Sequence, residues 1–156
     1  MAGDSAGGNL AAVMTQMARD AGGPRLKFQL LWYPATLLDP NLPSMIANAD
    51  APVLDATDMR LYEHCYLGDR PPVEPSVAPG RAADLSGLPA AYVAVAEFDP
   101  LHDDGVRYAE LLQTNGNAVE LADHTGLTHG FVGYVQWVPV AAEALARSLA
   151  ALTAAL

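Results

Sequence analysis

The feature that most constrains the fold of this chain lies at its start, in the segment Gly3-Asp4-Ser5-Ala6-Gly7. It matches G-x-S-x-G, the pattern of a sharp strand-to-helix turn that raises a serine hydroxyl above the end of a sheet. The two glycines let the strand and the helix approach a strained backbone closely. The pattern predicts Ser5 as a nucleophile and the Ala6 N–H as the first donor to a developing oxyanion. The alternative for Ser5 is a simple helix N-cap.

Composition excludes several classes of protein. The 156 residues suit a single domain, and 18 acidic against 8 basic residues give a net charge of −10. This charge repels phosphate backbones and anionic membranes, so we expect no nucleic-acid partner. The single Cys65 cannot form an intrachain disulfide, and we expect it to be reduced and buried within a helix.

No targeting or membrane segment is visible in the sequence. The first residues lack a basic region followed by an apolar run, so they do not resemble a signal peptide. The most apolar stretch, 138–156, is interrupted by Glu143 and Arg147 and is typical of an amphipathic helix. We therefore expect no membrane span and a cytoplasmic location.

Helical and strand patterns alternate along the chain, which predicts an α/β fold with a mostly parallel sheet covered by helices. The predicted strands are 28–33, 90–96 and 119–123, and the predicted helices are 9–21, 56–67, 103–115 and a last helix from about Pro139. The first helix is expected to pack through Leu10, Val13, Met14 and Met17, and the strand 119–123 is expected at a sheet edge. The proline-rich region that follows the first strand suggests an insert over about 37–70.

Two further residues follow predicted strands. Asp99 comes directly after the strand 90–96, and His129 lies beyond the strand 119–123. The order Ser, Asp, His is that of the Ser-His-Asp triad in one class of serine hydrolase, so Asp99 is the candidate orienter and His129 the candidate base. There are two alternatives. Asp99 only closes an Asx-turn, or His129 only caps a carbonyl and His124 is the base instead.

The remaining polar clusters give no competing chemistry. His64 and His102 are expected on helices or at the surface, and Asp103 and Asp104 are expected to complement a helix dipole. Their spacing repeats no metal-ligand pattern, and the glycines near Ser5 lack the lysine of a phosphate loop. We expect neither a metal nor a cofactor.

With these motifs assembled, the chain resembles the hormone-sensitive-lipase-like branch of the α/β-hydrolases, the bacterial family IV carboxylesterases. The resemblance rests on five segments that together span the chain: Gly3 to Ala11, Trp32-Tyr33-Pro34, Leu85 to Pro89, Asp99 to Gly105 and His129-Gly130-Phe131. It implies hydrolysis of short to medium acyl esters through an acyl-enzyme. Ser5 would be the nucleophile, Asp99 the orienter and His129 the base, and the insert 37–70 would be part of a cap over the acyl pocket.

The family also carries a His-Gly-Gly-Gly oxyanion loop and several strands before the serine, and these 156 residues contain no such loop. We therefore expect residues 1–156 to form the C-terminal part of the fold, with about three strands and the N-terminal half absent. The strand ending at Ser5 would be missing, 28–33 would be a bare edge, and loss of oxyanion donors would lower the activity of this truncated chain. The alternative is a non-catalytic remnant or interaction subunit that pairs through this edge, as a homo-oligomer or with a complementing N-terminal chain.

Overall fold

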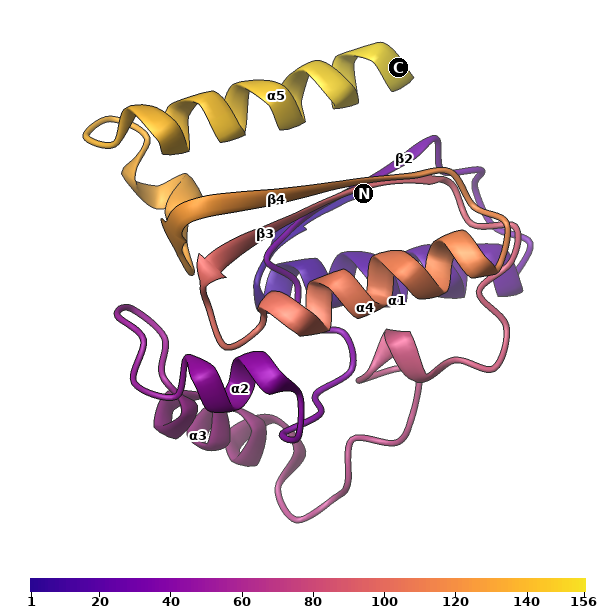
Figure 1. Ribbon diagram of the computed structural model, residues 1–156. Coiled ribbons are helices and arrows are strands. Elements are labelled where there is room, and N and C mark those ends of the chain that lie inside the picture. Colours follow the sequence, from indigo (N-terminus) through magenta and orange to yellow (C-terminus); the bar gives the residue numbers. More distant parts are fainter.

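The computed structural model describes all 156 residues and has a four-stranded sheet with helices on both faces (Figure 1). The strands are β1 (Ala2–Asp4), β2 (Phe28–Trp32), β3 (Ala90–Phe98) and β4 (Val119–Thr128). The α-helices are α1 (Ala6–Asp20), α2 (Pro43–Ala47), α3 (Ala56–Leu67), α4 (His102–Thr114) and α5 (Pro139–Ala155). Two short 3-10 helices are η1 (Pro79–Arg81) and η2 (Phe131–Tyr134).

All neighbouring strands are parallel, and their order in the sheet, β1-β2-β3-β4, is their order in the chain. One row of the register runs from Gly3 through Leu31 and Val93 to Leu121. Parallel strands bring their carboxyl ends to one edge of the sheet. The residues that follow β1, β3 and β4 therefore meet there, which is where the α/β prediction placed the site.

The prediction of about three strands was wrong by one, because Ala2–Asp4 pairs with β2 as a fourth strand. The strand 28–33 is therefore not a bare edge: β2 lies between β1 and β3, and the edge is the three-residue β1. A segment this short shows no alternation, so its sequence carries no strand signal. The last strand extends beyond the predicted 119–123 and ends directly before His129.

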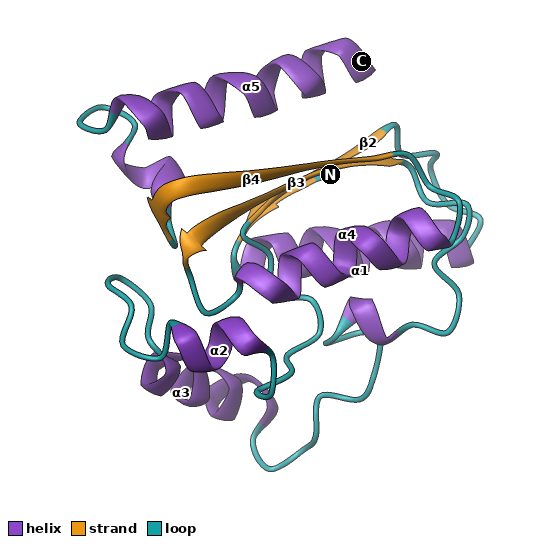
Figure 2. Cartoon of the chain, viewed as in Figure 1, coloured by secondary structure: helices purple, strands orange, loops and turns teal.

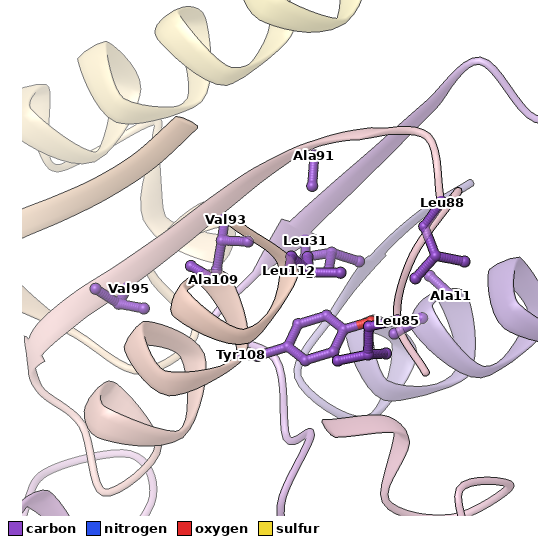
Figure 3. Packing of buried hydrophobic residues seen from close by; sticks show 11 residues of the cluster. Ala11, Leu31, Leu85, Leu88, Ala91, Val93, Val95, Tyr108, Ala109 and Leu112 are labelled. Carbon is purple, nitrogen blue, oxygen red and sulfur yellow. The ribbon is translucent and has the colours of Figure 1, made fainter. Parts of the chain in front are cut away.

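Helices α1 and α4 cover one face of the sheet and α5 covers the other, as the view coloured by secondary structure makes plain (Figure 2). Figure 3 shows how β2 and β3 meet α4, with Leu31, Val93 and Val95 facing Ala109 and Leu112, and with Leu85 beside Tyr108. Buried strands covered on both faces account for the nearly continuous apolar runs at 28–33 and 90–96.

Helix α1 does not pack as predicted. Val13 is buried, but Leu10, Met14 and Met17 are exposed to 52%, 46% and 53%. The buried face carries small or polar side chains instead, among them Gly8, Ala11, Ala12 and Thr15. The close approach of α1 to the chain after β2 explains this, because a Cβ at Gly8 would lie 2.9 Å from the Cβ of Pro34.

The insert between β2 and β3 contains α2 and α3, which lie beyond the end of the sheet marked by the strand arrowheads (Figure 1). The Asp55 side chain begins α3 by accepting hydrogen bonds from the Thr57 and Asp58 N–H groups. A small apolar cluster that includes Leu38, Met59 and Leu101 joins the insert to the end of β3.

Cys65 lies within α3 as expected, but it is exposed rather than buried. The face of α3 that packs inward is the one carrying Met59 and Leu67, and Cys65 is not on it. No helix combines the length and the apolar character needed to cross a bilayer.

Candidate active site

Ser5 occupies the turn between β1 and α1. Its backbone has φ 52° and ψ −120°, a conformation that residues other than glycine rarely adopt. Its backbone N–H donates to the Trp32 carbonyl at 2.9 Å, which fixes the turn to β2. Gly3 permits the turn, because a Cβ there would lie 2.1 Å from the Gly7 carbonyl oxygen. Ser5 stands at the N-cap position but its side chain makes no capping bond, so the hydroxyl is free for another partner.

That partner is His129. The Ser5 Oγ lies 2.9 Å from Nε2 of His129, and Nδ1 of the same ring lies 2.7 Å from Oδ2 of Asp99. In the tautomer that carries the ring proton on Nδ1, this nitrogen donates to the Asp99 carboxylate. Nε2 is then the acceptor for the serine hydroxyl, which is the arrangement a base needs to take a proton from Oγ.

Asp99 is fully buried at the junction of β3 and α4. Its Oδ1 accepts from the Leu101 N–H at 2.8 Å, which is the Asx-turn considered as the alternative. Its Oδ2 accepts from His129. The turn thus fixes one oxygen of Asp99 and leaves the other aimed at the imidazole, so the Asx-turn does not compete with the contact to His129.

The imidazole of His129 is held by its neighbours. Gly130 follows it in the left-handed conformation, with φ 75°, and the Tyr134 hydroxyl donates to the His129 carbonyl at 2.6 Å. The ring of Tyr33, which also has a positive φ of 37°, lies 4.7 Å from the imidazole at a tilt of 56°. Burial raises the pKa of the Tyr33 hydroxyl above its ordinary value, so this ring is a neutral wall beside the histidine.

The other histidines lie elsewhere. His124 is buried within β4 with its ring edge toward Phe131, and burial lowers its pKa. His102 begins α4 and lies 2.8 Å from Asp103 and 3.3 Å from Asp123, while His64 is on the exposed side of α3. None of them hydrogen-bonds to Ser5. No group of three or more His, Cys, Asp or Glu side chains is placed to hold a metal ion.

Asp104 does more than complement the dipole of α4. It is buried, and its carboxylate accepts from the backbone N–H groups of Thr36, Leu37 and Leu38 and from the Thr36 hydroxyl. It therefore anchors the loop that leaves β2 toward the insert. Burial raises the pKa of this carboxyl, and the hydrogen bonds from the loop oppose that effect. Spacing in the sequence gives no sign of this contact.

A cavity of about 450 Å³ opens beside the serine. Ser5, Ala6 and His129 lie in its wall, and most of the remaining wall is apolar, with Ala35 following β2 and Leu101 following β3. Asn9 and Leu10 of α1 also line it, and the insert supplies Leu38, Val53 and Leu54 together with Met59, Tyr62, Glu63 and Tyr66 of α3. The sequence predicted an insert over a pocket but did not identify these residues. Tyr62, Glu63 and Tyr66 follow Met59 by three, four and seven residues. This spacing places all four on one face of a helix and is the sequence signal that could have identified them.

Comparison with known proteins identifies the family of the chain. A family model described as alpha/beta hydrolase fold matches residues 1–133, and the chain therefore belongs to that family. The chain is 53% identical to Esterase LipI of Mycobacterium tuberculosis over 156 residues, covering 97% of this chain and 48% of the relative. It is 52% identical to Carboxylesterase NlhH of the same species, covering 100% of this chain and 50% of that protein.

Among solved structures, the crystal structure of DphMB1 matches with a TM-score of 0.96 and 50% identity, covering 99% of this chain and 52% of that one. The chain thus spans about half the length of the curated relatives it matches. The names of these relatives confirm the resemblance to the hormone-sensitive-lipase-like carboxylesterases that the motifs indicated.

Proposed function

We propose that this chain carries the catalytic triad of a serine carboxylesterase, with Ser5 as nucleophile, His129 as general base and Asp99 as its orienter. The observation that carries the proposal is the continuous hydrogen-bond chain from Ser5 Oγ through His129 to Asp99, opening on an apolar cavity. The relatives named esterase and carboxylesterase support an ester as substrate.

In this proposal the reaction runs through the three side chains of the triad. His129 Nε2 takes the proton of Ser5 Oγ as that oxygen forms a bond to the acyl carbon. The resulting oxyanion accepts from the Ala6 N–H, the first helical donor of α1, which has no partner within its own helix. His129 then gives the proton to the departing alcohol, and a water molecule repeats the sequence to release the acid. Asp99 stabilises the imidazolium in both halves of the cycle.

Residues 37–70 serve in this proposal as a cap-like insert within one partial α/β-hydrolase domain, 1–156. The support is that α3 walls the cavity from the side opposite the sheet and that Leu38, Val53 and Leu54 add apolar surface to it. An apolar wall next to Ser5 suits the acyl chain of an ester.

A second candidate function is pairing with another chain. Two observations favour it: the outer side of β1 is unpaired, and the side chains of Leu10, Met14 and Met17 on α1 are exposed. These three side chains are here called the α1 strip. Such a surface suits a second copy of this chain or a complementing chain that continues the sheet.

The test of the esterase proposal is hydrolysis of p-nitrophenyl butyrate by the purified chain. The Ser5→Ala variant is expected to lose turnover by on the order of a thousandfold or more. Ser76→Ala, which changes an exposed serine outside the cavity, is the matched control and should keep the parent rate. Equal turnover in the parent and the Ser5→Ala variant would overturn the proposal.

A further inference from the structure

One face of α3 departs from the pattern expected of a helix that walls an apolar cavity. Met59, Tyr62, Glu63 and Tyr66 stand at positions i, i+3, i+4 and i+7, and all four line the cavity beside Ser5. Three of them are apolar or aromatic, as this spacing predicts. The fourth places a carboxylate in a wall that is otherwise nearly free of charge, and a break in a local pattern of this kind is typical of a functional position.

The Glu63 carboxylate has no partner within the chain. None of the ion pairs in the structure includes Glu63. Arg60, one turn earlier on the same helix, donates to the Thr57 hydroxyl instead. Burial, and then the nearby Asp104, raise the pKa of Glu63, and no cation opposes them. A half-buried carboxylate without a counter-charge is costly unless a ligand supplies one.

The two aromatic neighbours of Glu63 suit the same kind of ligand. Tyr62 and Tyr66 are each more than half exposed, so their rings are open to an incoming group. The face of an aromatic ring attracts a cation, and such rings beside a carboxylate are a common way to bind ammonium groups. The net charge of −10 also draws cations toward the molecule as a whole.

We propose that Glu63, Tyr62 and Tyr66 form a subsite for an alkylammonium group carried by the ester that reacts at Ser5. The assignment of this ligand as an ester rests on the proposed function. The subsite selects esters that bear a quaternary or protonated tertiary amine over neutral esters of the same shape, and it disfavours esters that bear a carboxylate.

Binding is measured first, on the chain carrying Ser5→Ala, so that no turnover is needed. Titration calorimetry compares butyrylcholine with 3,3-dimethylbutyl butyrate, its neutral isostere in which carbon replaces the ammonium nitrogen. The expected preference for the cationic ester is on the order of tenfold. Adding Glu63→Gln should bring that ratio close to one.

Asp69→Asn is the matched control, because it removes the same unit charge from an exposed residue just beyond α3. It should leave the ratio near its starting value, which separates the subsite from the attraction of the overall charge. Tyr66→Leu is a second variant on an exposed side chain and should lower the ratio by severalfold. No preference in the parent, no measurable binding of butyrylcholine, or a ratio unchanged by Glu63→Gln would each overturn the subsite.

The same two esters are then offered to the chain with Ser5 intact. Turnover of both, with a kcat/KM preference that Glu63→Gln abolishes, supports the subsite and the esterase proposal together. If the binding preference is present but neither ester is hydrolysed, the esterase proposal fails and the cation subsite stands. If both esters are hydrolysed and the ratio of their kcat/KM values is the same in the parent and in Glu63→Gln, the esterase proposal stands and the subsite fails.

Discussion

At the scale of single residues, burial and charge drive two histidines in opposite directions. Burial lowers the pKa of His124, which has no acid within bonding distance. Burial also acts to lower the pKa of His102, but its hydrogen bonds with Asp103 and Asp123 outweigh burial and raise it. His102 therefore favours the protonated form in the folded chain.

This shift gives a prediction for stability against pH. A histidine whose folded pKa is raised contributes its full stabilisation below its unfolded pKa of about 6.5, and loses it as the pH rises through the folded value. His102→Gln should therefore reduce the free energy of unfolding more at about pH 5.5 than at about pH 8.5. Urea unfolding at the two pH values measures the difference.

His64→Gln is the control for that measurement, because His64 lies on the exposed side of α3 and pairs with no acid. A loss of stability in His102→Gln that is equal at both pH values would show that the ring acts by packing and not by its charge.

Asp99 and His129 could be predicted because each lies beyond a predicted strand and parallel strands end at one edge, whereas Ser5 could be predicted only from its G-x-S-x-G motif. Tyr33, Asp104 and Glu63 could not be placed in this way. Each lies close to a residue more than twenty positions away in the sequence. Tyr33 contacts His129, Asp104 contacts the loop at Thr36, and Glu63 lines the cavity that also borders Ser5. Local patterns carry no information about such contacts.

At the scale of elements, the fit of α4 on β3 depends on one glycine. A Cβ at Gly105 would lie 2.5 Å from Cγ1 of Val95, closer than real Cβ atoms come. Gly105→Ala should therefore force the helix away from the sheet and lower the free energy of unfolding by about 1–3 kcal/mol. Chemical denaturation of the purified variant checks this value.

Gly133→Ala is the matched control, because a Cβ there meets nothing within 4 Å. Its stability should stay within about 0.5 kcal/mol of the parent. If Gly105→Ala is as stable as Gly133→Ala, then α4 and β3 are not in rigid contact at this point.

Helix and strand patterns predicted most elements to within a few residues, and α3 matched its predicted bounds, 56–67. The failures have physical reasons. β1 is too short to show a period, and α1 buries small side chains because it lies close to Pro34, so its larger apolar residues face outward. Hydrophobicity alone identified the wrong face of that helix.

At the scale of the whole molecule, a parallel sheet normally has both of its outer strands covered or paired. Here β1 offers three residues with an unpaired side, and the α1 strip adds Leu10, Met14 and Met17 to the exposed apolar surface. The chain covers about half of relatives whose length is roughly twice its own, and its fold matches the solved relatives closely over that half. The exposed edge and the α1 strip are therefore the surfaces where association is expected.

We expect the purified chain to self-associate through the α1 strip, because exposed apolar surface is stabilised by burial against a second copy. Sedimentation velocity should show a coefficient that rises with concentration. The double variant Met14→Lys, Met17→Lys should remove this dependence, since two charges at the contact oppose its burial. Val140→Lys changes a residue of similar exposure on α5, at the opposite face of the sheet, and should associate as the parent does. A parent that sediments as a monomer at every concentration would mean that three residues of β1 and the α1 strip are too small a surface to hold a partner of this kind.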